Sequence, residues 1–339
     1  MILVTGGTGL VGSHLLLELT KKHDRVRAIH RPLSRLQNVS DLFALCLENP
    51  ESQFRKIEWV HADVRDIDSL IKAMEGVEYV YHTAAFVSFN PGDRYGMIQN
   101  NVGGTANVVN ACLEKKIRKL CYVSSTAALG SALPGKEITE DIIWTNSKSR
   151  SAYSLSKFNS EMEVWRGMAE GLEAVVVNPS IIVGPGDWKR SSSYLFSLVW
   201  KGIRFYTEGI TGYVDVRDVI RSMVDLMNSK LKGERYTISS ENLSYRQVLE
   251  MIAEALDKKS PRIRASSFLI SLAWRMDWLS HAFRGTPRNI TRDAVKSSKR
   301  KAIFSNRKIK EAIGIEFMPI DQSIKETARI FLRTHGSKA

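Results

Sequence analysis

The sequence predicts an α/β fold, a doubly wound parallel sheet with a smaller C-terminal α+β domain. Short apolar runs alternate with segments of helix length over the first 180 residues. The runs are unbroken rather than alternating with polar residues, which indicates strands that helices cover on both faces. Six runs are expected to be strands: 2–5, 26–30, 57–61, 79–83, 120–124 and 174–178. Segments 10–19 and 101–115, with apolar spacing near three and four, are expected to be connecting helices.

Composition fits this architecture. The chain has 339 residues, of which 43% are hydrophobic and 25% are charged, as in a globular protein of about two domains. These values exclude a chain disordered throughout and a multi-span membrane protein. No basic leader precedes the first strand, and no uncharged apolar stretch reaches the length of about 18 residues that a membrane helix needs. Cys46, Cys112 and Cys121 form no CxxC pair, which predicts reduced thiols and a cytoplasmic location.

The first strand is followed by a glycine-rich turn, TGGTGLVG, at residues 5–12. Gly6 permits the tight turn, Gly9 lets a pyrophosphate approach the backbone, and Gly12 lets the next helix lie close to the sheet. Free N–H groups at the start of that helix favour an anion. The strand–turn–helix position predicts a Rossmann dinucleotide-binding site. The residues expected to hold the cofactor here are Gly6, Thr8, Gly9, Leu10, Val11 and Gly12.

The pattern of elements changes after residue 184, where Pro, Gly and Ser residues indicate loop. Helices are expected at 217–228 and 245–256, and a strand at 236–239. We therefore expect a Rossmann domain over residues 1–180, with 212–230 returning to it. Residues 181–339 should form mainly the substrate-binding region.

The end of the second strand distinguishes the two nicotinamide cofactors. An NAD site favours a carboxylate there, which bonds the ribose 2′-hydroxyl. This strand ends in His30-Arg31-Pro32, and no carboxylate occurs before Asp41. Arg31 is suited to a 2′-phosphate, and Ser34 or Arg35 could assist it. The sequence therefore favours NADP(H), with NAD(H) as the alternative.

A Tyr-Lys pair gives the candidate chemistry. Tyr153 and Lys157 are four residues apart on an expected helix, so their side chains share one face. A nearby ammonium favours the ionised tyrosine and lowers its pKa toward the range useful for acid–base catalysis. Ser125 follows the fifth strand, at the sheet edge where ligands of parallel sheets bind. We expect Ser125 to donate a hydrogen bond to a substrate carbonyl.

Taken together, these motifs resemble those of the extended short-chain dehydrogenases/reductases, the NAD-dependent epimerase/dehydratase superfamily. The matching segments occur in order along most of the chain. They are Thr5 to Gly12, Asp63-Val64, His82-Thr83-Ala84-Ala85, Asn101 to Thr105, Ser124-Ser125, Tyr153 to Lys157, Asn178-Pro179-Ser180, Gly184-Pro185-Gly186 and Tyr213 to Val219.

The resemblance implies roles for individual positions. Ser125 is implied to orient the carbonyl, Tyr153 to act as acid/base and Lys157 to activate it. Asp63 is implied to bond the adenine amine, with Val64 beside it. Further cofactor contacts are implied for Thr83, Ala84, Ala85, Pro179, Ser180, Ile181 and Ile182, together with Tyr153 and Lys157. Residues 86–89, which follow this cofactor strand, are interpreted either as an apolar pocket wall or as core.

Fold alone does not determine the reaction in this superfamily. Thr126 and Ala127 occupy the positions of the Asp-Glu pair of the nucleotide-sugar dehydratases, which argues against dehydration. Arg31 and the C-terminal pattern ending in Phe317-Met318-Pro319 resemble the dihydroflavonol reductase and cinnamoyl-CoA reductase branch. We therefore expect an NADP(H)-dependent oxidoreductase that reduces a ketone or aldehyde, or oxidises the alcohol.

Two alternatives from other classes remain open. One is a nucleotide-sugar epimerase with bound NAD. The other is a non-catalytic NADP-binding regulatory protein, although such proteins usually lose the Tyr or Lys that this chain keeps. The +13 net charge suggests nucleic acid, but no nucleic-acid motif accompanies it. The histidines lack the spacing of a metal site, so none is expected.

The positive charge is regional. Between Lys258 and Lys310 lie 15 Lys and Arg residues and only two acidic ones. This basic segment is interpreted as a site for an anionic substrate such as a CoA ester or nucleotide sugar, as a peripheral membrane contact through 266–283, or as a solvated helical lid. The resemblance also implies a homodimer formed through the helices that carry Asn101 and Tyr153.

Overall fold

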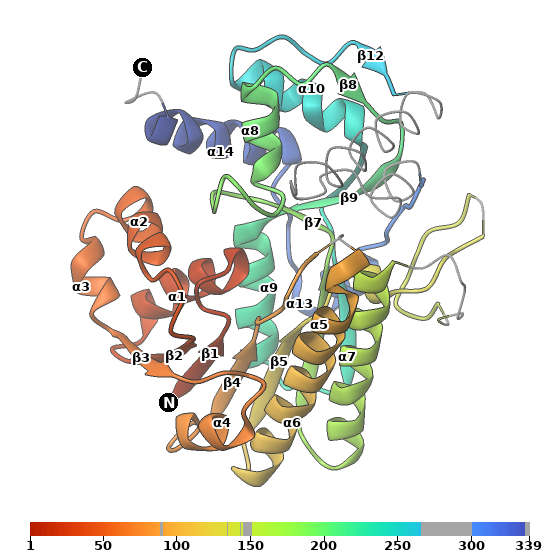
Figure 1. Cartoon of the computed structure of the whole chain (residues 1–339). Coiled ribbons are helices and arrows are strands. Elements are labelled where there is room, and N and C mark those ends of the chain that lie inside the picture. Colours follow the sequence, from red (N-terminus) through yellow and green to blue (C-terminus); the bar gives the residue numbers. More distant parts are fainter. Residues whose placement is uncertain (89–90, 134, 143, 145–150, 266–299, 336–339) are drawn as a thin grey trace.

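A central parallel sheet of seven strands organises the protein, in a computed structural model that describes all residues except 89–90, 134, 143, 145–150, 266–299 and 336–339 (Figure 1). Its strand order is β10-β6-β5-β4-β1-β2-β3. The strands are β1 (Ile2–Thr5), β2 (Val26–His30), β3 (Ile57–His61), β4 (Tyr79–His82), β5 (Lys119–Val123), β6 (Ala174–Pro179) and β10 (Glu234–Ile238). All six predicted apolar runs are strands of this sheet, so the doubly wound parallel prediction is confirmed.

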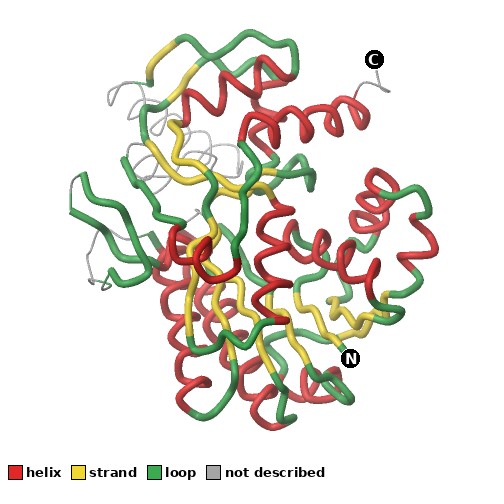
Figure 2. The backbone as a smooth tube through the Cα atoms, turned by 180° about the vertical axis from the view of Figure 1, so that it is seen from behind, coloured by secondary structure: helices red, strands yellow, loops and turns green. Residues whose placement is uncertain are grey.

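Helices cover both faces of the sheet, because the strands are apolar on both sides (Figure 2). One layer contains α1 (Leu10–Lys22), α2 (Gln37–Cys46), α9 (Val216–Asn228) and α13 (Arg307–Ile313). The other contains α4 (Ile67–Ala73), α6 (Gly104–Glu114) and α7 (Ala152–Ala169). Two short helices extend the layers: α3 (Pro50–Phe54) contacts α1 and α2, and α5 (Arg94–Ile98) contacts α7.

A second, smaller core lies beyond the carboxyl ends of the strands (Figure 1). It forms around a three-stranded sheet of order β11-β9-β7. Its elements are β7 (Ile181–Val183), α8 (Tyr194–Trp200), β9 (Ile210–Asp215), β11 (Glu241–Ser244), α10 (Tyr245–Ala255) and α14 (Ile320–His335). The short strands β8 (Phe205–Tyr206) and β12 (Ile263–Arg264) pair beside it. The chain thus passes between the two sheets several times, with α9 and β10 belonging to the large one.

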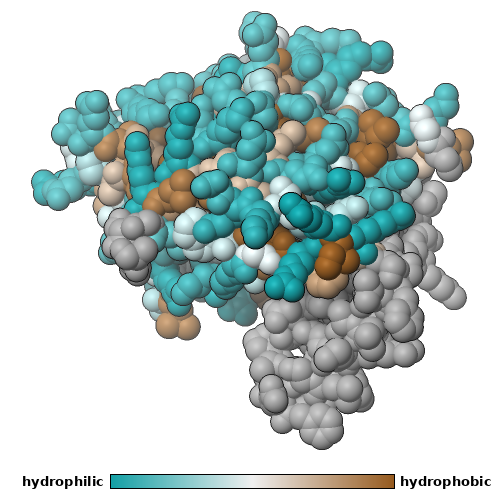
Figure 3. Space-filling model, turned by 90° about the horizontal axis from the view of Figure 1, so that it is seen from above, coloured by the Kyte–Doolittle hydropathy of each residue, from teal (hydrophilic) through white to brown (hydrophobic). Residues whose placement is uncertain are grey.

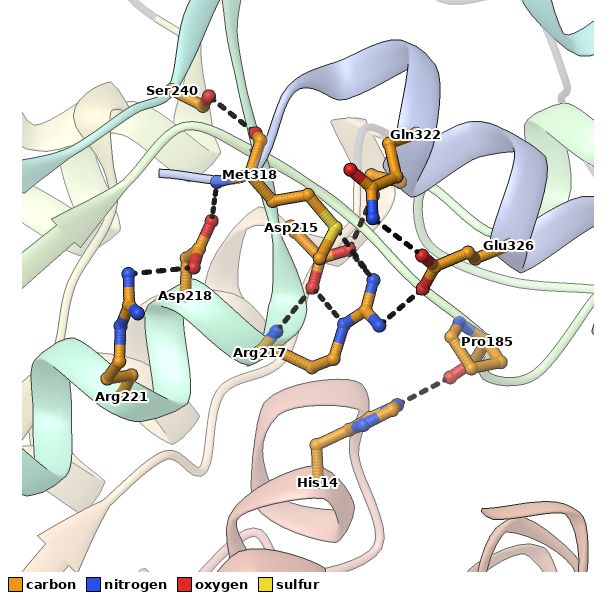
Figure 4. Close-up of polar contacts among 11 residues, drawn as sticks. His14, Pro185, Asp215, Arg217, Asp218, Arg221, Ser240, Met318, Gln322 and Glu326 are labelled. Carbon is orange, nitrogen blue, oxygen red and sulfur yellow. Dashed lines mark hydrogen bonds and ion pairs between the residues drawn. The ribbon is translucent and has the colours of Figure 1, made fainter. Parts of the chain in front are cut away.

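A buried carboxylate joins the C-terminal helix α14 to α9 (Figure 4). Asp215, 1% exposed, caps α9 by accepting from Arg217 N and also accepts from Ser323 Oγ of α14 at 2.6 Å. Arg217 pairs with Asp215 and with Glu326 of α14. Burial disfavours the charged form of Asp215, but the hydrogen bonds from Arg217 and Ser323 more than offset this, so its pKa is lowered. The second core is thereby fixed to the sheet.

The basic segment is only partly described, and its apolar stretch 266–283 lies outside the described residues. Several described cations already have partners in the chain. Lys258 lies over the Trp200 ring at 4.0 Å, Arg264 pairs with Glu208, and Lys308 contacts Glu234. No described helix is both long and apolar enough to cross a bilayer. In the view of Figure 3, the described surface is mostly hydrophilic, with apolar residues in small separate groups.

Candidate active site

The glycine turn leaves an open helix N-terminus at the carboxyl end of β1. Gly6 has φ +71°, and a Cβ there would lie 2.6 Å from backbone atoms of Ala84. Gly9 caps α1 without any side chain, and no acidic residue lies in the first turn. A Cβ on Gly12 would come within 2.2 Å of Gly6 O. Because the backbone N–H groups at Leu10 and Val11 have no capping side chain, this cradle fits the pyrophosphate of a dinucleotide.

The ends of β2 and β3 carry the residues predicted for the adenosine side. Arg31 is exposed, and its backbone N–H donates to Ser34 Oγ at 3.0 Å. Asp63 is half-buried and pairs with Arg65 at 2.8 Å. Hydrogen bonds from Arg65 lower the pKa of Asp63, and the positive charge of Arg31 contributes. Arg31 and Asp63 thus follow the ends of the neighbouring strands β2 and β3. Val64 is buried, and its side chain lies against Gly104.

Buried polar side chains fix the loop after β4. Thr83 Oγ1 donates to Thr5 O at 2.7 Å, and Ala84 N donates to Thr5 Oγ1 at 3.3 Å. Asn101 bonds both the N–H and the carbonyl of Phe86, at 2.7 and 2.9 Å. Ala85 is exposed, as are Phe86 (38%) and Val87 (53%), so these apolar side chains are not core.

Ser125, Tyr153 and Lys157 converge at the carboxyl end of β5. Ser125 is the second residue after the strand, and the run of buried residues stops just before it, at Ser124. Tyr153 lies in the first turn of α7, where Ser151 caps the helix through Ser154 N. Burial raises the pKa of Tyr153, and a hydrogen bond with Ser125 opposes that rise, so the net shift in this structure is opposite to the lowering expected from Lys157. The hydroxyl groups of Ser125 and Tyr153 therefore face one another, as a shared carbonyl ligand requires.

Lys157 lies under this pair, 3% exposed. Its Nζ donates to Val123 O at 2.9 Å and is 5.3 Å from the centre of the Tyr122 ring, a cation–π distance. Burial lowers the pKa of Lys157 to about 8, and the negative charge of Glu161 opposes the shift. The ammonium form therefore still dominates at neutral pH.

The remaining predicted cofactor positions follow β6. Pro179 ends that strand, Ser180 N donates to Ile238 O at 3.0 Å, and both residues are buried. Ile181 and Ile182 begin β7 and are half-buried. The sheet order passes from β1 to β2 and β3 on one side and to β4, β5 and β6 on the other. The glycine turn thus lies at the topological switch point between β1 and β4, where open α/β sheets bind ligands, and Ser125 follows the next strand beyond β4 at the same sheet edge.

Sequence reasoning did not identify Glu161 or Arg235 as part of this region. Glu161 is completely buried behind Lys157 and bonds Ser124 Oγ at 2.8 Å. Arg235, on the edge strand β10, donates to Glu161 at 2.9 Å. The spacing of four residues between Lys157 and Glu161 could have indicated that Glu161 lies on the same face of the helix. No signal in the sequence pointed to Arg235, which lies 74 residues from Glu161 along the chain.

Comparison with known proteins agrees with this geometry. The model of the NAD dependent epimerase/dehydratase family matches residues 2–239. Sterol demethylase protein B of Methylococcus capsulatus is 32% identical over 293 residues, covering 84% of each chain. A putative dihydroflavonol 4-reductase of Synechocystis is 28% identical and covers 98% of this chain and 94% of its own. Cinnamoyl-CoA reductase 1 of Petunia hybrida is 25% identical, with 97% and 91% covered.

Solved structures give the same result. The crystal structure of gox2253 has a TM-score of 0.81 and 30% identity, covering 99% of this chain and 98% of that one. UDP-glucose 4-epimerase from Thermotoga maritima, solved with UDP-glucose, has a TM-score of 0.77 at 20% identity, covering 98% and 99%, and shows the shared fold. With the glycine turn and the Tyr-Lys helix in the same architecture, the chain belongs to the NAD dependent epimerase/dehydratase family and is a nicotinamide-dependent oxidoreductase of the extended short-chain dehydrogenase/reductase type.

Proposed function

We propose that this protein reduces a ketone or aldehyde with NADP(H), or oxidises the corresponding alcohol, through Ser125, Tyr153 and Lys157. The observation that carries the proposal is the convergence of these three side chains at the carboxyl end of β5. Ser125 and Tyr153 share a hydrogen bond, and the buried Lys157 ammonium donates to Val123 O, two residues before Ser125. Two hydroxyl donors directed at one point suit a carbonyl oxygen that gains negative charge.

Ser125, Tyr153 and Lys157 have different roles in the proposed reduction. When bound, the nicotinamide cofactor supplies the hydride that the carbonyl carbon accepts. Ser125 donates a hydrogen bond to the carbonyl oxygen and so holds it next to Tyr153. The Tyr153 hydroxyl gives its proton to that oxygen, which completes the alcohol. The Lys157 ammonium stabilises the tyrosinate left behind, because a positive charge lowers the pKa of a neighbouring phenol.

The preference for NADP(H) is supported by the end of β2. Arg31 is exposed there, with Ser34 bonded to its backbone. A guanidinium beside the adenosine ribose favours a 2′-phosphate over a 2′-hydroxyl. The test compares Kd values of NADPH and NADH for the wild type and for Arg31→Asp. We expect the wild type to favour NADPH, and the variant to lose at least about tenfold in NADPH affinity, about 1.4 kcal/mol. A wild type that prefers NADH would overturn this assignment.

The reaction itself is tested with a panel of carbonyl compounds. NADPH oxidation that depends on a carbonyl substrate, and that Tyr153→Phe abolishes while cofactor binding persists, is the expected result. Full activity in Tyr153→Phe would exclude the mechanism. A tightly bound NAD in the purified protein, with no net cofactor oxidation, would instead favour the nucleotide-sugar epimerase. Cofactor binding without turnover of any substrate would favour the regulatory alternative.

The substrate and partners follow from the surroundings of the site. The exposed side chains of Phe86 and Val87 next to the cofactor strand favour an apolar group near the carbonyl. Exposed cations of the basic segment, such as Lys259 and Arg262, favour an anionic substrate, for example a CoA ester. We also propose a homodimer formed through α6 and α7. Met162, 39% exposed on α7, supports it.

The organisation of the chain completes the proposal. Residues 1–180, with 212–230, are taken as the cofactor domain and 181–339 as mainly the substrate-binding region. A cytoplasmic location is supported by Cys46, Cys112 and Cys121, all free thiols. Peripheral membrane contact through the basic segment is tested by co-sedimentation with anionic vesicles, and absence of binding at low salt would rule it out.

A further inference from the structure

Glu161 extends the line of functional side chains along α7. Tyr153, Lys157 and Glu161 follow one another at intervals of four residues, so they share one face of the helix. Glu161 is 0% exposed. A carboxylate is rarely buried so completely unless hydrogen bonds and an opposite charge compensate it.

One oxygen of Glu161 holds the segment that carries Ser125. Glu161 Oε2 accepts from Ser124 Oγ at 2.8 Å and from Asn178 Nδ2 at 2.9 Å. The same Asn178 amide donates to the carbonyl oxygen of Ser125 at 3.1 Å. Glu161 therefore fixes the residue before Ser125 directly and the backbone of Ser125 through Asn178.

The other oxygen is bound by a cation from the sheet edge. Glu161 Oε1 accepts from Arg235 Nη1 at 2.9 Å and from Trp165 Nε1 at 3.4 Å. Arg235 also donates Nε to Glu140 O at 3.0 Å. Such a buried ion pair is costly to desolvate and often adds little to stability compared with apolar residues. Here the ion pair instead connects three elements, because Glu161 on α7 is bonded by Asn178 of β6 and by Arg235 of β10.

The charge of Glu161 also acts on Lys157, one helical turn away. The groups that act on the Lys157 ammonium are Glu161 on α7, Tyr122 on β5 and His82 on β4, while Tyr153 lies one helical turn before Lys157 on α7. Burial lowers the pKa of His82 to about 3, so it is neutral. Among these groups, Glu161 is the carboxylate, and its charge favours the ammonium form of Lys157.

We propose that Glu161 is a positioning residue of the active site: it holds the Ser125 backbone through Ser124 and Asn178, from a place on α7 one helical turn after Lys157. The inference rests on the function proposed above for Ser125, Tyr153 and Lys157. It assigns Glu161 no contact with substrate or cofactor.

The test compares Glu161→Gln with Glu163→Gln. Glu163 lies on the same helix but pairs with Arg166 at the partly exposed surface, so it controls for loss of a carboxylate from α7. For Glu161→Gln we expect unchanged NADPH affinity and a fall in kcat of about 10- to 100-fold, as for a small misplacement of a reacting group. The alkaline limb of the pH–rate profile should move to lower pH. Glu163→Gln should match the wild type in NADPH affinity, in kcat and in the pH–rate profile.

A double variant separates positioning from folding. Leaving Arg235 buried without its partner destabilises Glu161→Gln, whereas Glu161→Gln with Arg235→Gln removes both charges. If Tm recovers in the double variant and kcat stays low, Glu161 positions the site. If kcat recovers together with Tm, or if neither kcat nor the pH profile changes in Glu161→Gln, the proposal is overturned.

A measurement without substrate distinguishes this proposal from the proposed function. NMR of ¹³C-labelled lysine side chains in the NADP⁺-loaded protein reports the titration of Lys157, with Lys157→Arg to assign its signal. Glu161→Gln should lower that titration midpoint even if no carbonyl substrate is turned over. An unshifted midpoint refutes the role of Glu161, whereas an inactive wild type with a shifted midpoint refutes only the proposed reaction.

Discussion

Gly12 is the position where adding a single methyl group should separate helix propensity from cofactor-site geometry. It lies in the first turns of α1, where alanine would normally stabilise the helix by up to about 1 kcal/mol. However, the new Cβ would lie 2.2 Å from Gly6 O, 2.8 Å from Gly6 C and 2.9 Å from Gly7 Cα. Ordinary contacts begin at 3.4 Å, so the start of α1 or the turn must move by about 1 Å. Because backbone atoms form the contact, no flexible side chain can relieve it.

The cost should exceed the gain in propensity. Overpacking of this kind typically costs about 1–3 kcal/mol, which lowers Tm by roughly 2–4 °C per kcal/mol for a chain of this size class. A displacement of about 1 Å at the helix N-terminus should also raise the Kd of the nicotinamide cofactor at least about tenfold. Thermal unfolding and a fluorescence titration with NADPH measure the two effects.

Gly103 provides the matched control. It has helical dihedrals, φ −62° and ψ −41°, and a Cβ there would meet nothing within 4 Å. Gly103→Ala should therefore keep cofactor affinity and gain roughly 0.4–1 kcal/mol. If Gly12→Ala is as stable as Gly103→Ala and binds the cofactor equally well, the close approach of α1 to the glycine turn is not what holds the cofactor.

Three further outcomes are expected. Lys119→Met should lower the free energy of unfolding by about 1.5–3 kcal/mol in a denaturant titration. The reason is that the buried Lys119 ammonium donates to Leu226 O at 2.6 Å and to Ser229 O at 2.9 Å at the end of α9. An unchanged unfolding midpoint would contradict this. The depressed pKa of Asp215 contributes stability that is complete above its unfolded pKa of about 3.9 and is lost as pH falls through the folded pKa. Asp215→Asn should therefore be less stable at pH 7, and the difference should shrink as pH falls below the unfolded pKa of about 3.9. A difference that persists undiminished in acid would argue against the ion pair. A thiol reagent should modify exposed Cys46 in the native protein and reach Cys121, whose pKa burial raises to about 12, only after unfolding; rapid native reaction of all thiols would contradict the burial.

Much of the large sheet was predictable because its signals are local. Each apolar run is contiguous in sequence, and runs covered on both faces read as buried parallel strands without knowledge of their neighbours. The six strands predicted from apolar runs agree with the observed ones to within about a residue at each end, and the strand predicted at 236–239 begins two residues late relative to β10, the usual precision of such boundaries. The smaller region was harder, because β7 and β11 have three and four residues and are only partly buried, so their periodicity is weak.

The candidate site shows the same division. The spacing of Tyr153 and Lys157 on a helix, and the three glycines after a strand, could be read directly from the sequence. Glu161 was overlooked because its i+4 spacing from Lys157 is equally typical of a surface salt bridge. Its burial depends on Ser124, Asn178 and Arg235, which come from three different strands or their ends.

The sequence by itself determined the parallel strands, the anion cradle at the start of α1 and the Tyr-Lys face of α7, since each depends on residues that are close together in the sequence. The tertiary structure alone decided that β10 is the seventh strand, that Arg235 thereby reaches Glu161, and that α14 is fixed to Asp215. These pairings join segments far apart in sequence, and their free energy depends on sheet order and on desolvation at the contact. No local pattern of residues records either quantity.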